Sequence, residues 1–533
     1  MTALILACDT IRTLDPRRPF ATAVAVDGGV IAAVGDRRDI PAWRGRGTEV
    51  IDLGRATLTP GLTDSHTHPV LGLDMTAGLD LSGCADLAAV RAALREAVLV
   101  TQPGEWVLGW GLDPNSFGII PVGSGAIEDV LDGRPAVLTL FDGHSVLASR
   151  EALRRAGVDG PRRFGSRSAV ACDERGRPTG HLLEEGAMRL VRSVIPASSF
   201  AARRDRLAAL LREMAAAGLT GGHAMDLDAD ALELYAALDA DGELPLRLRL
   251  APWRRPEDDP SAVRELLGWQ GRAGRLWQVA AVKLFMDGTV DGGTAWLHEP
   301  DCHGQSAAAY WRDPRDYTEA VRVLARAGVQ TATHAIGDAA VTHVLNTLAA
   351  VVPAGSRVRH RIEHIETLPS DQVPRFAELG VVASMQPSHA TDYTRADNSD
   401  NWSRRLGPLR AGRAWRCRDL VDAGAVLALG SDWPIAPYDP RGVMAAARLR
   451  RPASRPDLAP VGPDQALTGE QALYGYTAAP AVAAGTRGGR VAAGCLADLT
   501  AFGADPCRTP AQELPGVAVL LTVVDGVVRF RAD

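Results

Sequence analysis

The middle of this 533-residue chain repeats one pattern, in which a short apolar or β-branched run is followed by an alanine-rich stretch of helical character. Such alternation predicts strands and helices in a parallel α/β architecture. Eight such runs are present, and eight is the strand number of a closed (β/α)8 TIM barrel. The runs are ATLTPGLTDSH, GLTGGHAMD, LPLRLRLAP, VAAVKLFMDG, VQTATHAIGD, VRHRIEHIE, VVASMQPSH and AVLALGSDWP.

The two ends of the chain differ from the middle, because they consist of short β-rich runs joined by turns such as DGG and DG. We expect residues 1–58 and 481–533 to pair into one small β-sandwich domain beside a barrel at 59–480. About 130 residues, roughly 70–200, separate the first predicted strand from the second. That length is too great for one connection, so it predicts an inserted subdomain after barrel strand 1.

Composition excludes several classes of protein. The chain is 46% hydrophobic and 23% charged, which is typical of a globular protein, and its net charge of −6 without a basic run gives no reason to expect nucleic acid. Seven dispersed cysteines without a CxxC pair argue against a disulfide framework or a cysteine zinc site. No signal peptide or membrane span is evident. We therefore expect a cytoplasmic protein with a small-molecule substrate, and leave a homodimer open.

Polar side chains of metal-ligand or acid–base type end several of the predicted strands, which is where barrels form their active sites. The first strand ends in His66 and His68, whose i, i+2 spacing directs both rings to one point. Each residue alone has a structural interpretation, such as a helix cap or a salt-bridge partner. Their joint appearance in one register favours a site. The other members are Lys283, His334, His364 and Asp432.

Imidazole and carboxylate ligands suit one or two divalent ions, Zn²⁺ first and also Mn²⁺, Fe²⁺ or Ni²⁺. A catalytic ion keeps a position for water, whose pKa it lowers toward about 7. Asp432 is the expected general base that takes the proton of this water and passes it to a leaving group. Lys283 becomes a ligand only if CO₂ adds to its amine, because the resulting carbamate can bridge two ions.

With these residues in place, the chain resembles the amidohydrolase superfamily, and within it the family 3 amidohydrolases, the group that includes N-substituted formamide deformylase. The resemblance implies a distorted (β/α)8 barrel with a β-sandwich built from both chain ends. The motifs that carry it are TPGLTDSHTHP, DGHSVLAS, VKLFMDGT, HAIGDAA, RIEHIETL, ASMQPSH, GSDWPIAPYDP and YGYTAAPAVAAGTRGGRVAAGCLADLTAF.

The resemblance also implies a role for each ligand. His66 and His68 would bind the more buried ion, and His334 and His364 the second ion. Lys283, as a carbamate, would bridge the two.

The implied reaction is hydrolysis of a non-peptide C–N bond, in an amide, formamide or related N-acyl compound, by metal-activated hydroxide with Asp432 as ligand and general base. Ester or lactone hydrolysis, or isomerisation, on the same site stays open. A non-catalytic scaffold is disfavoured, because such relatives usually lose ligands and here the set is complete.

Four further residues are candidate substrate contacts. His144, in FDGHS, is by resemblance also a catalytic candidate, against the alternative of a structural histidine in a turn. Asp287 either contacts substrate or orients Lys283. His389 ends the seventh strand and could line the pocket. Trp110 lies in the tryptophan-rich segment EWVLGWGLDPNSFG, which either walls the pocket or forms the aromatic core of the insertion.

Overall fold

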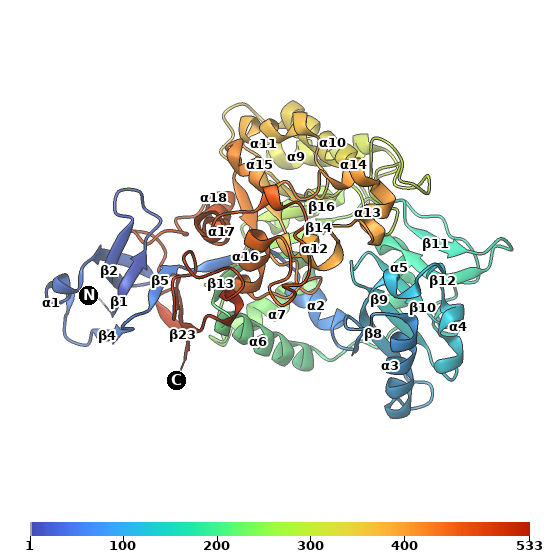
Figure 1. The fold of residues 1–533 in the computed structure, drawn as a ribbon, viewed down its shortest axis with the longest axis horizontal. Coiled ribbons are helices and arrows are strands. Elements are labelled where there is room, and N and C mark those ends of the chain that lie inside the picture. Colours follow the sequence, from blue (N-terminus) through green and yellow to red (C-terminus); the bar gives the residue numbers. More distant parts are fainter. Residues whose placement is uncertain (1–2, 533) are drawn as a thin grey trace.

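The computed structural model describes residues 3–532, which form a central barrel, an end domain on the left of Figure 1 and an insertion on its right. The barrel strands are all parallel and follow the order β20-β19-β18-β17-β16-β14-β13-β6, with short β15 added to β14. All eight predicted strands are confirmed. Their bounds are β6 Leu62–Thr67, β13 Leu219–Leu227, β14 Arg247–Arg254, β16 Ala281–Phe285, β17 Gln330–Ala335, β18 Arg361–His364, β19 Val382–Met385 and β20 Leu427–Leu429, and the added strand is β15 Trp277–Val279.

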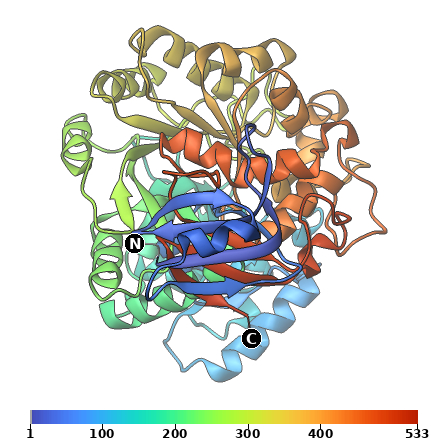
Figure 2. The same cartoon turned by 90° about the vertical axis from the view of Figure 1, so that its left-hand side faces the viewer.

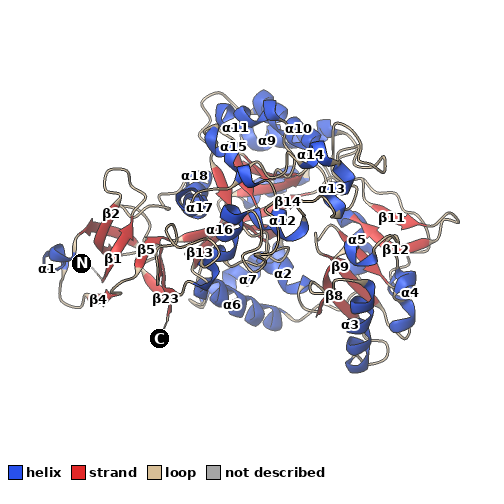
Figure 3. Cartoon of the chain, in the orientation of Figure 1, coloured by secondary structure: helices blue, strands red, loops and turns tan. Residues whose placement is uncertain are grey.

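Helices surround these strands, as the blue elements of Figure 3 show. Apolar side chains on the outer face of the strands and the inner face of the helices form one large buried core, which includes Leu211, Tyr235, Val341 and Phe376. The helices are α2 Pro69–Met75, α6 Phe200–Ala216, α7 Ala229–Ala240, α8 Ala262–Trp269, α9 Pro314–Arg326, α10 Asp338–Val351, α11 Val373–Leu379, α12 Pro387–Tyr393, α13 Asn401–Leu406, α14 Pro408–Ala411, α15 Cys417–Asp422, α16 Pro440–Leu449, α17 Gly469–Tyr476 and α18 Ala478–Ala484.

The barrel has a seam, because its hydrogen-bonded strand order begins at β20 and ends at β6 without pairing these two strands. The loop after β20 closes the seam instead. The backbone N–H of Asp432 donates to the carbonyl of His66 at 2.7 Å, and that of His68 donates to the carbonyl of Trp433 at 2.8 Å. The first and last strands of the barrel are thus joined at the two places where the sequence predicts metal ligands.

The insertion between β6 and β13 has its own sheet, in the order β11-β12-β10-β9-β8-β7. Two buried apolar clusters stabilise it; Phe117 lies inside one, and Trp106 packs against the other. Its elements are β7 Leu79–Asp80, α3 Leu87–Val100, β8 Val107–Leu112, β9 Ala136–Leu140, β10 Ser145–Ala148, α4 Arg150–Arg155, β11 Ala169–Cys172, β12 Pro178–Leu183 and α5 Glu184–Arg192.

Strands from both ends of the chain build the end domain, which Figure 2 shows with N-terminal strands in blue and C-terminal strands in red. β1 pairs with β2 on one edge and with β4 and then β5 on the other, and β5 continues the sheet to β21. One apolar cluster joins side chains of both ends, including Leu6 and Leu521. The elements are β1 Leu4–Arg12, β2 Phe20–Asp27, β3 Val30–Gly35, α1 Ile40–Trp43, β4 Glu49–Asp52, β5 Thr57–Pro60, β21 Leu499–Phe502, β22 Val519–Val524 and β23 Val527–Arg531. A search of the described helices for a membrane-crossing segment finds none.

Candidate metal centre

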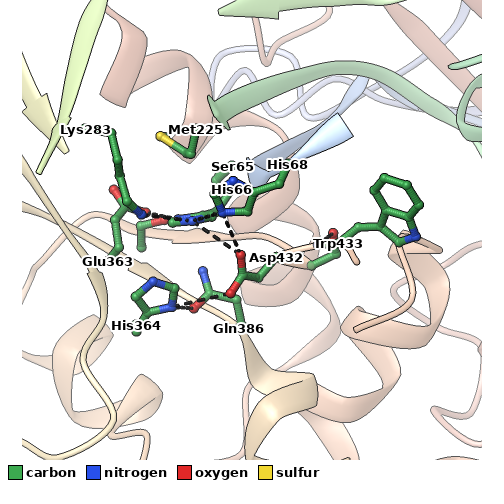
Figure 4. Close-up of polar contacts among 12 residues, drawn as sticks. Ser65, His66, His68, Met225, Lys283, Glu363, His364, Gln386, Asp432 and Trp433 are labelled. Carbon is green, nitrogen blue, oxygen red and sulfur yellow. Dashed lines mark hydrogen bonds and ion pairs between the residues drawn. The ribbon is translucent and has the colours of Figure 1, made fainter. Parts of the chain in front are cut away.

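Three side chains converge at the seam of the barrel and form the first ligand group: His66, His68 and Asp432 (Figure 4). The Nε2 atoms of the two histidines lie 3.2 Å apart. Asp432 Oδ1 lies 3.4 Å from Nε2 of His66 and 3.1 Å from Nε2 of His68. All three residues are buried, so few competing water molecules reach these atoms.

The other oxygen of Asp432 faces a second ligand group, which adds His364 and His389. Asp432 Oδ2 lies 3.8 Å from His364 Nδ1 and 3.8 Å from His389 Nε2. His364 and Asp432 have φ values of +76° and +59°, in the left-handed region that non-glycine residues rarely occupy. Backbone strain of this kind is concentrated at functional sites, where surrounding structure holds it in place.

Lys283, the only lysine in the sequence, lies beside the first ligand group. Its Nζ is 3.1 Å from His66 Nε2 and 5.2 Å from the centre of the Phe285 ring. Burial lowers the pKa of Lys283 to about 8, although Glu363 and Asp432 oppose this shift. A larger share of the amine is therefore neutral at physiological pH, and the neutral amine is the form that reacts with CO₂.

A buried chain of charges fixes His66. Its Nδ1 lies 2.7 Å from Glu363 Oε2, and Arg361 donates to both oxygens of Glu363 at 2.6 and 2.9 Å. Burial opposes ionisation of Glu363, but Arg361 and His66 outweigh it and hold the pKa of this carboxyl well below its usual range. An ionised Glu363 requires a proton on Nδ1 of His66, so Nε2 carries the free lone pair, on the side of Lys283, His68 and Asp432. Sequence analysis missed Arg361 and Glu363, although their i, i+2 spacing on β18 was visible.

Asp64 holds the two ligand-bearing segments together and was also missed. Its Oδ1 accepts hydrogen bonds from the backbone of His66 at 3.1 Å and of Ser431 at 3.0 Å, and its Oδ2 accepts from the Ser431 hydroxyl at 2.5 Å. Gly430 lies against this junction, since a Cβ there would come within 2.6 Å of the His66 nitrogen. A side chain at this position would push the seam apart.

His334 lies beside the second ligand group and lines the cavity above it. Its ring is 4.5 Å from that of His364, and its Nε2 is 3.1 Å from the carbonyl of Gly288. His389, which the sequence did not name as a ligand, lies in this group, and the role of His334 as a ligand stays a prediction.

Two predicted substrate contacts, Asp287 and Trp110, are not among the residues that line the cavity. The carboxylate of Asp287 is fully buried, because it accepts hydrogen bonds from the backbone of Trp296, Ile336 and Gly337 at 2.8–3.0 Å. It therefore orders the barrel mouth. Trp110 lies within β8 of the insertion.

A cavity opens above both ligand groups. His144 and His389 line it, as predicted. Its aromatic walls come from residues that the sequence did not single out: Phe141, Trp253, Phe285, Tyr310, Tyr393, Trp402 and Trp415. We call its polar base the cavity floor, which comprises His66, His68, Lys283, His364, His389 and Asp432.

The floor fits a divalent cation on the chemistry of its donors. Burial and the nearby Lys283 amine lower the pKa of His66 to about 4, so its ring is neutral. Asp432 Oδ1 is buried without a hydrogen-bond donor among the described residues, and the lone pair of His66 Nε2 faces it. Lone pairs that converge in a buried space repel one another unless a cation lies between them. The donor set lies at the carboxyl-end face of the barrel, where barrel enzymes have their active sites, and is that of a metal-dependent enzyme.

The chain belongs to the amidohydrolase family, whose sequence model matches residues 49–530. It is 28% identical to N-substituted formamide deformylase from Arthrobacter pascens, over all of this chain and 99% of that protein. It is 30% identical to Protein LONG AFTER FAR-RED 3 from Arabidopsis thaliana, over 84% of this chain and 78% of that protein. Among solved structures, a metal-dependent hydrolase of uncharacterised function from Pyrococcus horikoshii has a TM-score of 0.73 at 22% identity, with 95% of this chain and 99% of that chain covered.

Proposed function

We propose that this protein hydrolyses the C–N bond of a small amide, formamide or related N-acyl compound. The observation that carries the proposal is the convergence of His66 Nε2, His68 Nε2 and Asp432 Oδ1 beneath an open cavity. The full-length similarity to N-substituted formamide deformylase supports a C–N bond over other targets.

We propose that the first ligand group holds one divalent ion and the second ligand group another, with Lys283 between them as a carbamate. Zinc is the first choice, because neutral imidazole and carboxylate are its usual donors when no thiolate is present. When bound, such an ion supplies a Lewis acid and lowers the pKa of water toward about 7.

Asp432 is the residue proposed to move the proton of the reaction. Burial alone would raise the pKa of this carboxyl, but His66 and His68 outweigh burial and hold it below its usual value. It is thus ionised at neutral pH and ready to accept a proton. Because it projects from the seam toward the cavity, it can carry that proton from water to the nitrogen of the departing amine.

His144 is proposed to bind the substrate carbonyl. Its Nδ1 lies 2.9 Å from Glu184 Oε2 at the edge of the cavity. Burial lowers the pKa of His144, but Glu184 and Asp142 outweigh burial and raise it to about 9. The ring is then charged at neutral pH, and its Nε2–H can donate a hydrogen bond to an oxygen on which negative charge develops.

The test is amine release from a panel of N-formyl, N-acetyl and N-aroyl amines by the zinc-loaded protein. We expect turnover by the wild type and a loss of about 10²–10⁴-fold in Asp432→Asn, the usual range for a general base. Asp422→Asn, an exposed aspartate on α15, is the matched control and should keep full activity.

Failure to release any amine would contradict C–N hydrolysis. Turnover of a parallel ester and lactone panel would then favour the alternative chemistry on the same floor. The cytoplasmic location stays a prediction.

A further inference from the structure

Three of the five carboxylates that line the cavity outside the floor form no ion pair with a described cationic side chain. They are Asp142 after β9, Asp291 after β16 and Glu366 after β18, which we call the acidic wall. No Lys, Arg or His nitrogen of residues 3–532 lies within 4.0 Å of their oxygens in an ion pair. Glu366 is buried, and Asp142 and Asp291 are half-buried. Carboxylates removed from water are normally paired, so this wall is an exception that a ligand would explain.

Each carboxylate of the wall is held by a neutral donor. The Thr289 hydroxyl donates to Asp142 at 2.8 Å, and the side-chain amide of Asn401 donates to Asp291 at 2.8 Å. The Trp402 indole N–H donates to Glu366 Oε2 at 2.6 Å. Glu366 is only 8% exposed, and no residue of the described chain donates to its Oε1. The wall therefore presents an open acceptor oxygen to the cavity. Burial raises the pKa of its three carboxyls, so a cation bound there would favour their charged forms.

Other acidic residues of the same cavity show that pairing was available. Glu184 bonds to His144 at 2.9 Å, and Glu185 forms an ion pair with Arg192 at 3.4 Å. The His144 ring attracts Asp142 through space, yet its hydrogen bond goes to Glu184. Only the acidic wall is left without a cationic partner.

The wall is too dispersed to chelate a metal ion. The groups of described His, Cys, Asp and Glu residues whose ligand atoms lie within 4.8 Å of one another contain none of its three carboxylates. An extended organic cation can contact carboxylates that are farther apart, because its charge is spread over several donor or methyl groups. The spacing therefore favours an organic cation over a metal ion.

Aromatic rings surround the acidic wall. The Trp402 and Trp415 rings lie 4.8 Å apart, and the Phe141 and Tyr393 rings lie 4.1 Å apart, all lining the cavity. Aromatic faces attract ammonium and guanidinium groups, and the attraction grows when water is excluded. Carboxylates and aromatic faces together match one kind of ligand.

We propose that the acidic wall binds an organic cation, an ammonium or guanidinium group on the part of the substrate that is not held at the cavity floor. This specificity rests on the proposed function for its biological meaning, but the binding itself requires no turnover. The substrate class is then an N-acyl compound that carries a positive charge at its other end.

The test compares two ligands that differ only in charge, (3-hydroxyphenyl)trimethylammonium and 3-tert-butylphenol. Neither contains a hydrolysable bond, so calorimetric binding reports on the wall whether or not the protein cleaves amides. We expect the cation to bind the zinc-loaded wild type at least about tenfold more tightly. Equal affinities in the wild type would overturn the proposal.

Two isosteric variants and one control locate the effect. Asp291→Asn and Glu366→Gln should each reduce the preference for the cation by about threefold or more, and the double variant should abolish it. Glu185→Gln removes a carboxylate of the same cavity that is already paired, so it should keep the preference within about twofold. A double variant that melts like the wild type and keeps the full preference would contradict the proposal.

Discussion

On the cavity floor, His66 and His364 are bonded to Glu363 and Gln386, whereas on the acidic wall the carboxylates meet only neutral donors. The floor comes mostly from strand ends of the barrel, with His389 from α12, and the wall from loops and the insertion. The difference teaches that the protein fixes the geometry of its reactive groups before any substrate arrives. It leaves charge unbalanced only where a substrate can neutralise it.

The largest expected effect is on the floor, at Lys283. Lys283→Ala should lower metal affinity by more than about 100-fold, because loss of a ligand costs more than loss of an outer partner. Since Lys283 is the only lysine, wild type equilibrated with ¹³C-bicarbonate should show a single lysine carbamate signal by NMR, which the variant lacks.

Short carboxylic acids should restore part of the activity of Lys283→Ala, since they can bridge as the carbamate would. If Lys283→Ala kept full metal content and turnover, Lys283 would have no role in metal binding, and the difference between a pre-ordered floor and an unpaired wall would be smaller than proposed.

A smaller effect is expected at the support of His66. Glu363→Gln should lower metal affinity by about 10–100-fold, because a neutral amide no longer fixes the proton on Nδ1 of His66. Glu378→Gln, an exposed residue of α11, is the control. Competition with a chromogenic chelator measures the affinity, and equal values for the two variants would show that the floor needs no dedicated partner.

The close packing at the seam predicts that replacing two glycines by alanine has opposite effects on the free energy of unfolding. Gly430→Ala should destabilise the protein by about 1–3 kcal/mol, because its Cβ would overlap the His66 backbone. Gly442→Ala, in α16 with open space around it, should stabilise by about 0.4–1 kcal/mol. Denaturant unfolding of both variants, monitored by circular dichroism, checks the signs; two similar changes would argue against a tight seam.

The smallest expected effect concerns the wall and pH. Burial raises the pKa of Asp291 to about 7, and Asp142, Asp113 and Asp400 add to the shift. Below pH 7 the carboxyl is mostly neutral, and above it mostly charged. The preference for the cationic ligand should therefore rise a few-fold between pH 6 and pH 8. Asp291→Asn should flatten this part of the profile while metal content stays constant. A loss of metal in this variant would show that the wall and the floor do not act independently.

The fold and the floor were predictable from sequence because both depend on local patterns. A strand ends where its apolar run ends, so the positions of His66, His68, His364 and Asp432 followed from the alternation of strands and helices. The sequence also singled out His389 as a residue of the pocket, but the structure places it in α12, beyond the end of β19, and within the second ligand group.

The partners of these residues were not predictable in the same way. Asp64 and Ser431 are 367 residues apart and meet only because the barrel closes. The wall is still harder to predict from sequence. Asp142 and Glu366 line the same cavity only because of where the insertion packs, and no periodic sequence pattern indicates that position. Trp110 shows the converse, because this aromatic residue of the insertion lies in β8 and is not among the residues that line the cavity.

The seam has one further consequence. Because β6 and β20 do not pair, the ring of strands is fastened by the residues that would grip an ion, and the reactive centre is also the clasp of the scaffold. Removal of the ion by a chelator should then lower the stability of the barrel as well as abolish activity. Conversely, binding of the ion should close the barrel and complete the active site in one step.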